Sequence, residues 1–339
     1  MVGESILNGA SVLVTGGTGS FGNAFVAMTL ERWDPKRIII FSRDEMKQWD
    51  MAERYATDPR IEFAIGDVRD HNRLASVMAG TDVVVHAAAT KIVPTAEYNP
   101  FECVKTNVNG AMNVIDAAIA TNVKHVVALS TDKASNPINL YGATKLASDK
   151  LFVAANDARG AHGTRFSVVR YGNVMGSRGS VIPFFVERAK NGVLPITDAR
   201  MTRFMITLEQ GVEMVWHALD DAVGGEIYVR KIPSMGILDI AAAVSEAAEH
   251  EFIGIRPGEK LHEQMISTEE APHTFDFGWY YAILPSIHRW SSDPARVRAG
   301  VAVPEGFHYA SDTNDVWMSR DDLRAWLATP GVDGSVLTA

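Results

Sequence analysis

Residues 130–150, STDKASNPINLYGATKLASDK, bring together three side chains that could exchange protons: the carboxyl of Asp132, the amine of Lys133 and the phenol of Tyr141. Lys145 follows Tyr141 by four residues, so both lie on one face if the segment is helical. An ammonium near a phenol favours the phenolate and lowers the pKa of the tyrosine. Tyr141 could then remove a hydroxyl proton while hydride leaves the same carbon. Taken alone, however, the pattern also fits a surface helix and a loop ion pair.

The segment SVLVTGGTGSFG, residues 11–22, predicts a strand, a glycine-rich turn and the start of a helix. Gly16, Gly17, Gly19 and Gly22 permit a tight turn and let backbone amides approach a pyrophosphate at the positive end of the helix. A purely structural turn is the alternative, but the position at the start of a βαβ unit favours a dinucleotide site. In that setting residues 130–150 follow the fifth strand, and alcohol oxidation by a nicotinamide becomes the favoured interpretation.

The end of the second strand bears on the type of dinucleotide. Its sequence FSRDEMK has Arg43 and Lys47 where an NAD site often has an acidic residue on the ribose hydroxyls. These cations favour the 2′-phosphate of NADP, although they could also be a solvated helix start. Asp67, at the end of the third strand, could accept a hydrogen bond from the adenine amine, and HAAA at 86–89 offers small residues beside the dinucleotide.

These motifs need a scaffold, and the chain predicts an α/β fold with a doubly wound parallel sheet. Six near-continuous apolar strands alternate with helical patterns up to FSVVRYGNV. We expect an NADP-binding Rossmann domain at 1–175. Residues 176–339 are expected to form mainly a smaller substrate-binding α/β cap, with helices in PFFVERAKNG, TLEQGVEMVWHALDD and ILDIAAAVSEAAEH and a strand in GEIYVR. The last seventy residues contain no motif that predicts chemistry.

The bulk composition excludes several classes. The 339 residues are 47% hydrophobic and 22% charged, an ordinary globular balance. Apolar runs are too short to span a membrane, and the single Cys103 fits a core or surface thiol in a reducing cytoplasm, which is the expected location. A net charge of −9 argues against a nucleic-acid face, and no metal site is predicted.

The glycine turn, YGATK and the strand order resemble the extended short-chain dehydrogenase/reductase superfamily. Longer segments, among them FSRDEMKQWDM, STDKASNPINLYGATKLASDKLF, VVRYGNVMGSRGSVIPFF and IRPGEKLHEQMI, are similar to soluble UDP-N-acetylglucosamine 4,6-dehydratases of the configuration-inverting type, from about residue 8 to 266. Those enzymes begin the route to pseudaminic acid, a sugar used to glycosylate flagellin and other bacterial surface polymers.

The resemblance implies roles for the triplet at 131–133. Asp132 would protonate the departing C6 hydroxyl, Lys133 would be the acid/base at C5, and Thr131 would polarise the C4 oxygen. Related retaining dehydratases have glutamate at the third place and 4-epimerases lack the acid and amine pair, so Lys133 implies inversion at C5. To act as a base, Lys133 needs a pKa lowered toward neutrality.

Motifs and resemblance together predict two contact sets. The cofactor set comprises Gly16, Thr18, Gly19, Ser20, Phe21, Gly22, Ser42, Arg43, Asp44, Lys47, Asp67, Val68, Ala87, Ala88, Ala89, Lys91, Leu129, Ser130, Tyr141, Lys145 and Val174. The substrate set comprises Lys91, Asn173, Ser177, Arg178, Val181, Thr197, Met201, Arg203, Arg256 and Glu259, with Arg203 and Arg256 as phosphate clamps.

The chain departs from the family at Ile92, where histidine is common, and at Arg230, where proline is expected; both changes bear on the selectivity of the pocket. Two other functions stay open: a dehydratase/5-epimerase or epimerase on another N-acetylated sugar nucleotide, and a non-catalytic NADP sensor. The family also implies a homo-oligomer, of which a hexamer is one form.

Overall fold

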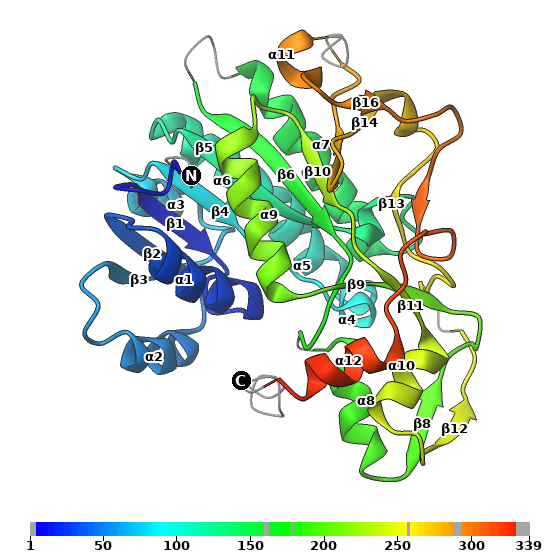
Figure 1. Cartoon of the computed structure of the whole chain (residues 1–339). Coiled ribbons are helices and arrows are strands. Elements are labelled where there is room, and N and C mark those ends of the chain that lie inside the picture. Colours follow the sequence, from blue (N-terminus) through cyan, green and yellow to red (C-terminus); the bar gives the residue numbers. More distant parts are fainter. Residues whose placement is uncertain (1–4, 159–162, 178, 256–257, 288–292, 330–339) are drawn as a thin grey trace.

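The computed structural model describes residues 5–158, 163–177, 179–255, 258–287 and 293–329 (Figure 1). Six strands predicted from the sequence are confirmed: β1 (Ser11–Thr15), β2 (Arg37–Ser42), β3 (Ile61–Ile65), β4 (Val83–His86), β5 (His125–Thr131) and β6 (Arg165–Tyr171). They are parallel and lie in the order β3-β2-β1-β4-β5-β6. This is the strand order of a doubly wound dinucleotide-binding sheet.

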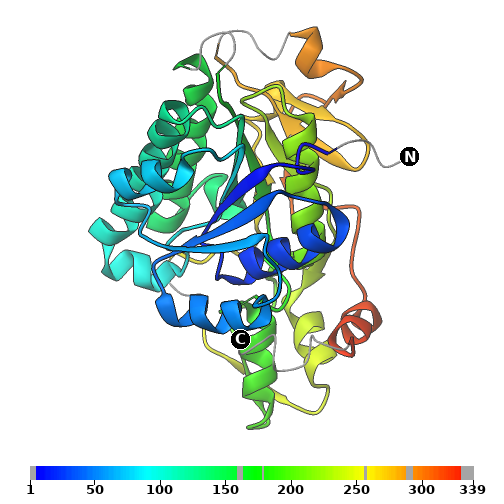
Figure 2. The ribbon, with the colours of Figure 1, turned by 90° about the vertical axis from the view of Figure 1, so that its left-hand side faces the viewer.

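The two faces of the sheet have separate cores, because successive side chains of a strand point to opposite faces. In β1, Val12 and Val14 join one buried apolar cluster and Leu13 joins the other. Helices α1 (Ser20–Arg32) and α9 (Leu208–Asp221) cover the first face, and α3 (His71–Met78), α6 (Gly110–Ala120) and α7 (Leu140–Ala158) cover the second (Figure 2). Near-continuous apolar strands are therefore buried on both sides.

Shorter elements connect these layers. Helix α2 (Glu45–Arg54) packs beside β2 and β3. Between β4 and α6 the chain forms α4 (Val93–Tyr98), α5 (Pro100–Val104) and the π-helix η1 (Lys105–Asn109). The other short elements are η2 (Asp132–Ala134), β13 (Gln264–Ile266), η3 (Ala271–His273), α11 (Pro294–Val297) and β17 (Tyr309–Ala310).

A smaller unit projects from the carboxyl-end side of the sheet and has its own core of apolar residues such as Phe185, Leu194 and Met235 (Figure 1). Its elements are β7 (Asn173–Val174), α8 (Val181–Ala189), β8 (Val193–Ile196), β9 (Thr202–Ile206), β11 (Ser234–Gly236), α10 (Ile237–Val244), β12 (Glu249–Phe252) and α12 (Arg320–Leu327). We refer to this unit as the cap.

The division at residue 175 needs correction, because later segments return to the sheet. β10 (Ile227–Arg230) pairs in parallel with β6, and β15 (Tyr280–Ile283), β14 (Thr274–Asp276) and β16 (Val301–Ala302) extend that edge antiparallel. The described part of the sheet thus has ten strands. Three short strands of the C-terminal seventy residues, in which the sequence offered no motif, thus extend this edge.

The helix predicted in ILDIAAAVSEAAEH also ends early. α10 stops at Val244, and Ser245 is extended, with φ −156° and ψ 111°. Residues 249–252 instead form β12, which pairs in parallel with β8. Strand pairing in the cap therefore overrides the local helix propensity of the alanine-rich segment.

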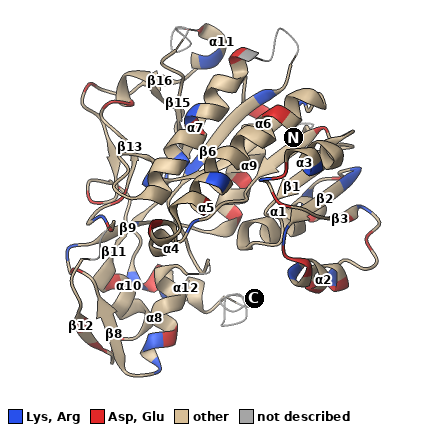
Figure 3. Cartoon of the chain, turned by 180° about the vertical axis from the view of Figure 1, so that it is seen from behind, with Lys and Arg blue, Asp and Glu red and all other residues tan. Residues whose placement is uncertain are grey.

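Seen from behind, acidic and basic residues are interspersed, and α2 carries both signs (Figure 3). Across the described ranges, no helix has both the length and the apolar character needed to cross a bilayer. The same residues contain no group of three or more His, Cys, Asp or Glu side chains placed to hold a metal ion.

Candidate active site

The turn between β1 and α1 forms a cradle in which a side chain has no room. Gly16 has φ +67°, and a Cβ there would lie 2.8 Å from Ala88 N. A Cβ on Gly22 would lie 2.3 Å from Gly17 O. The N-cap residue of α1 is Gly19, so amides at the start of this 13-residue helix are not capped by a side chain. A close-packed glycine turn that presents helix amides fits the pyrophosphate of a dinucleotide.

The aromatic side chain of Phe21 connects this turn to the end of strand β6. It lies on the first turn of α1 and stacks on Tyr171, at the end of β6, with ring centroids 6.5 Å apart. The turn residues Thr18 and Ser20 lie beside it in the chain. Gly16 packs against the loop containing Ala87, Ala88 and Ala89, which follows β4.

Two buried polar side chains that sequence reasoning missed brace that loop. His86 Nδ1 lies 2.8 Å from Thr15 Oγ1, which in turn accepts a hydrogen bond from Ala88 N. Burial, with a contribution from the charge of Lys145, lowers the pKa of His86 to about 3, so the imidazole is neutral. Asn107 binds both N and O of Thr90. The only signal for His86 was its place at the end of a strand that enters HAAA.

Cys103 is a buried thiol 3.6 Å from Thr144 Oγ1, which confirms the core interpretation. Burial raises its pKa, so it is not a reactive thiolate.

The end of β2 places the predicted ribose-binding residues together, but partners already occupy some of them. Asp44 caps α2 by accepting from Lys47 N, and its carboxylate lies 3.2 Å from Lys47 Nζ. Asp67 makes an ion pair of 2.7 Å with Arg69, whose hydrogen bonds lower the pKa of Asp67. Arg43 is exposed beside Asp67, so it is the better placed of the two predicted cations to meet a phosphate.

The remaining predicted cofactor residues line the same edge of the sheet. Ser42 ends β2, where its Oγ and O accept from Gln48 Nε2. Val68 is buried and contacts the position of Gly110 in α6. Leu129 and Ser130 lie at the end of β5. Lys91 is exposed after β4, and Val174 lies in β7.

Thr131, Asp132 and Lys133 follow directly at the end of β5, where the chain enters η2. Asp132 is fully buried, and its Oδ1 accepts from Thr131 Oγ1 at 2.9 Å and from Lys133 Nζ at 3.1 Å. Across the described ranges its Oδ2 has no hydrogen-bond partner. Burial and the nearby carboxylate of Glu263 raise the pKa of Asp132, which suits a proton donor.

Glu263 is a residue that the sequence did not single out. It lies just before β13, only 3% exposed, and its Oε1 is 3.2 Å from Lys133 Nζ. The Lys133 ammonium therefore bridges two buried carboxylates. Although burial alone would lower the pKa of Lys133, Asp132 and Glu263 together raise it. The expected pKa near neutrality is thus wrong for this arrangement, because two carboxylates stabilise the ammonium and nothing near Lys133 in the chain indicates the second one.

Tyr141 and Lys145 lie on the first turns of α7, and Gly142 brings this helix against the triplet. A Cβ on Gly142 would lie 2.2 Å from Lys133 O. Burial raises the pKa of Tyr141 to about 12, although the charge of Lys133 and a hydrogen bond with Thr131 act in the opposite direction. Burial also lowers the pKa of Lys145. The expected fall in the tyrosine pKa is therefore not seen, since desolvation of the phenol outweighs the neighbouring cations.

A buried ionic network, which the sequence did not indicate, begins at Ser130, next to the triplet. Ser130 Oγ donates to Asp149 at 2.7 Å, and Asp149 pairs with the fully buried Arg170. Arg170 makes two hydrogen bonds of 3.0 Å to Glu270, which follows β13. The network ties β5, β6 and α7 to the C-terminal half of the chain.

The predicted substrate residues are partly brought together. Asn173, Val174 and Val181 line one small hollow between β7 and the start of α8, and Ser177 lies in the turn between them. Arg203 Nη1 donates to Thr202 O and Leu261 O, and its Nε lies 3.7 Å from Glu263. A phosphate would have to compete with these contacts.

The remaining predicted substrate residues that the structure describes lie in or near the cap. Met201 is buried, Thr197 follows β8, and Glu259 is half-buried. Arg178 and Arg256 lie outside the described residues.

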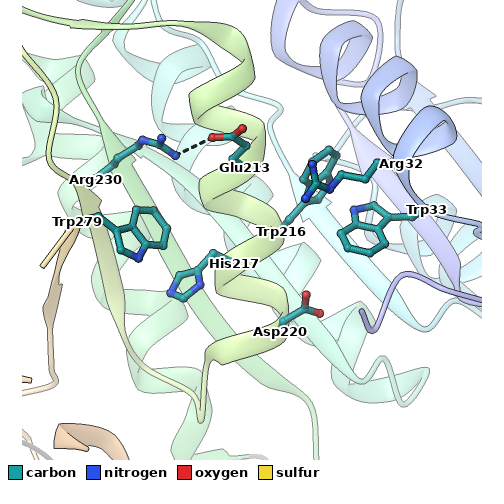
Figure 4. A pocket seen from close by; sticks show the side chains of 8 residues that line it. All are labelled: Arg32, Trp33, Glu213, Trp216, His217, Asp220, Arg230 and Trp279. Atoms are coloured by element: carbon teal, nitrogen blue, oxygen red, sulfur yellow. Dashed lines mark hydrogen bonds and ion pairs between the residues drawn. The ribbon is translucent and has the colours of Figure 1, made fainter. Parts of the chain in front are cut away.

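A separate hollow of about 380 Å³ lies between the end of α1, α9 and the hairpin of β14 and β15 (Figure 4). Arg230 lines it, pairs with Glu213 at 3.0 Å and lies over the ring of Trp279. None of the predicted catalytic residues lines this hollow. Arg230 thus lines a hollow that the triplet does not share, and Ile92 is exposed at the N-cap of α4.

Comparison with known proteins adds relatives that match most of the chain. A UDP-N-acetylglucosamine 4,6-dehydratase (inverting) of Campylobacter jejuni is 54% identical, covering 94% of this chain and 97% of the relative. A UDP-glucose 4-epimerase of Rickettsia canadensis is 45% identical, covering 80% and 82%.

Solved structures match the fold. Pen from Bacillus thuringiensis is 36% identical, with a TM-score of 0.88 and coverage of 96% of this chain and 99% of that one. DesIV, a dTDP-glucose 4,6-dehydratase from Streptomyces venezuelae solved with NAD bound, is 24% identical, with a TM-score of 0.67 and coverage of 74% and 86%. The family described as polysaccharide biosynthesis protein matches residues 12–285. The chain belongs to this polysaccharide biosynthesis family, and its fold is that of the short-chain dehydrogenase/reductase-like dehydratases and epimerases.

Proposed function

We propose that the protein is a UDP-N-acetylglucosamine 4,6-dehydratase that inverts C5 and forms UDP-2-acetamido-2,6-dideoxy-β-L-arabino-hex-4-ulose. The observation that carries the proposal is the buried contact between Asp132 and Lys133, held against the helix of Tyr141 at the carboxyl end of β5. It supports the proposal because elimination needs a proton donor and an amine beside an oxidation pair. The inverting dehydratase at 54% identity supports the same function.

The reaction divides among these side chains. A nicotinamide dinucleotide held by the glycine turn would supply the hydride chemistry, which oxidises C4 of the sugar and later reduces C6. Tyr141 takes the proton of the C4 hydroxyl in its phenolate form; burial disfavours that form, the charge of Lys133 favours it, and Lys145 supplies further positive charge from the same helix face. Thr131 polarises the C4 oxygen. With a ketone at C4, the C5 proton becomes acidic and can pass to Lys133, while Asp132 gives its proton to the C6 hydroxyl, which departs as water.

The direct contact between Lys133 and Asp132 suggests how both reach the required state. Movement of one proton from Lys133 Nζ to Asp132 Oδ1, across 3.1 Å, yields a neutral amine and a neutral acid together. The amine can then accept a proton and the acid can donate one. A raised pKa at Asp132 makes this exchange less costly than it would be at an exposed carboxylate.

For the cofactor, we favour NADP over NAD because Arg43 is exposed at the end of β2, and no carboxylate stands in its place. The glycine cradle accommodates either dinucleotide.

A second candidate is an epimerase on a related sugar nucleotide, which the 45% identical UDP-glucose 4-epimerase favours. An epimerase would return hydride to C4 and leave the C6 hydroxyl in place. Asp132 and Lys133, which elimination needs, argue for the dehydratase.

The test is to incubate the protein with UDP-N-acetylglucosamine in deuterated water, without added cofactor, and to follow the sugar by proton NMR. A new C6 methyl signal, deuterium at C5 and L-arabino couplings would support the proposal. A D-xylo product would refute inversion by Lys133, and a C4 epimer would favour the second candidate. Unchanged substrate, even with NADP added, would favour another sugar nucleotide or a non-catalytic sensor.

Three further expectations extend this proposal. The product would feed pseudaminic acid synthesis for flagellin or other surface glycans, the protein would work in the cytoplasm, and it would form a homo-oligomer. The first is checked by the sugar that accumulates when the gene is deleted, and the last by light scattering.

A further inference from the structure

The carboxylate of Glu263 contacts the Lys133 amine together with the assigned acid, Asp132. Its Oε1 is 3.2 Å from Lys133 Nζ, and Asp132 Oδ1 is 3.1 Å from the same nitrogen. The side chains of Asp132 and Glu263 are 1% and 4% exposed, whereas that of Lys133 keeps 22%. The amine is therefore the most accessible member of this group of three, and two buried carboxylates hold it.

We propose that Glu263 is a positioning residue for Lys133: a fixed anion that aims the amine at C5 of the substrate and keeps the proton on Asp132 until the C6 hydroxyl leaves. This inference rests on the function proposed above and assigns to it a residue 130 positions away in the chain.

The backbone holds Glu263 firmly enough for this role. Glu263 N donates to Ser311 Oγ at 2.9 Å, and Ser311 N donates to Glu263 O at 2.8 Å. The main chain of Glu263 is thus held by contacts that do not depend on the charge of its carboxylate. Substitution by glutamine would leave these contacts in place and remove the charge alone.

The charged groups around the Glu263 carboxylate favour its ionised form and the protonated form of Asp132. Lys133, Arg203 and Lys260 are its cationic neighbours, and their charges lower the pKa of Glu263, while burial opposes them. Asp132 is the anionic neighbour, and Glu263 raises its pKa. Two carboxylates around one ammonium cannot both be ionised at equal cost, so Glu263 takes the charge and Asp132 the proton.

The proton balance follows from this assignment. In the reactive form, Asp132 is protonated, Lys133 is a neutral amine and Glu263 is ionised. Elimination transfers the C5 proton to Lys133 and the Asp132 proton to the leaving hydroxyl, so the group ends as carboxylate, ammonium and carboxylate. Return of one proton from Lys133 to Asp132 restores these three groups. Hydride return to C6 is completed when a solvent proton adds to the opposite face of C5, and Tyr141 gives the proton that it took from the C4 hydroxyl back to solvent. Glu263 stabilises the ammonium as it forms and keeps its own charge throughout.

The test compares Glu263→Gln, Glu263→Asp and wild type in kcat against pH, by the NMR assay for the C6 methyl product. The amine must be unprotonated and Asp132 protonated, and both pKa values fall when the neighbouring anion is removed. Both limbs of the profile should therefore move to lower pH in Glu263→Gln, by about one unit or more. Its maximal kcat should fall roughly 10- to 100-fold with little change in KM. Glu263→Asp keeps the charge and should keep the wild-type limbs.

Glu226→Gln is the matched control, since Glu226 is a fully buried carboxylate that pairs with Arg296 at 3.1 Å, away from the triplet. Its profile should coincide with wild type. The proposal would be overturned if the two limbs of the kcat profile stay at the wild-type pH in Glu263→Gln. It would also be overturned if Glu226→Gln shifts both limbs by the same amount as Glu263→Gln. Should Glu263→Gln fail to fold, limbs displaced by a unit in Glu263→Asp would overturn it as well. Wild type without C6 methyl product would instead reject the proposed function.

Discussion

Replacing Lys133 with alanine should abolish dehydration and also make stability depend on pH in a new way. The side chain contributes the ammonium between Asp132 and Glu263. Loss of an acid/base group costs roughly 10²- to 10⁴-fold in rate. The cradle of Gly16, Gly17 and Gly22 does not involve Lys133, so cofactor retention should persist.

The stability effect follows from the charges that remain. Without the ammonium, Asp132 and Glu263 would be two buried carboxyls, and the pKa of Asp132, already raised in the native protein, would rise further. A carboxyl whose folded pKa lies above its unfolded value of about 3.9 contributes its full stability below that pH and loses it as the pH rises toward the folded pKa. The loss is about 1.4 kcal/mol per pH unit, so Lys133→Ala should be destabilised by up to about 4 kcal/mol more at pH 8 than at pH 5.

Two assays check this prediction. Urea unfolding at pH 5 and pH 8 gives the stability difference, and NMR of UDP-N-acetylglucosamine in deuterated water gives turnover. Lys150→Ala, on the exposed side of α7, is the control and should match wild type in both. Wild-type turnover by Lys133→Ala would refute the assigned role. An equal stability loss at the two pH values would refute the electrostatic argument.

Three other predictions test the cofactor edge. Wild type should lose about 1.4 kcal/mol of stability per pH unit as the pH falls from about 6.5 toward 3, because His86 is neutral in the fold and its pKa is lowered to about 3; urea unfolding of His86→Gln should give a shallower slope, and an equal slope would contradict the argument. Gly22→Ala should lose its bound cofactor, and thermal melts should show that its free energy of unfolding falls by more than about 2 kcal/mol, since its Cβ would lie 2.3 Å from Gly17 O. Gly9→Ala, at φ +69° with nothing within 4 Å, should show only the backbone cost of about 1 kcal/mol in the same thermal melts. Arg43→Ala should weaken binding of NADP more than of NAD in fluorescence titrations, and an unchanged ratio would reject the preference for NADP.

Local patterns were enough to predict the first half of the fold. The β-branched runs of β1 to β6, and the glycines at 16–22, act over a few neighbouring residues, so period and spacing identify them. The triplet and Tyr141 were found for the same reason, because they lie within one segment of the chain.

Pairings between distant segments could not be predicted in this way. Glu263 meets Lys133 across 130 residues, and Arg170 meets Glu270 across 100. Nothing near either position indicates its partner, and the pKa directions of Lys133 and Tyr141 depend on those partners and on burial. β10 was predicted as a strand of the cap, although its partner is β6 in the main sheet.

The close approach of Gly142 to Lys133 O has a consequence for the timing of the reaction. Oxidation at C4 is assigned to Tyr141 and elimination across C5 and C6 to the triplet, and main-chain contact fixes the spacing between these two groups. Under the proposed function, a sugar bound once would be within reach of both groups, and the keto intermediate would need no relocation between steps. The proposed function thus implies that the keto intermediate stays bound, and that only water and the finished product are released.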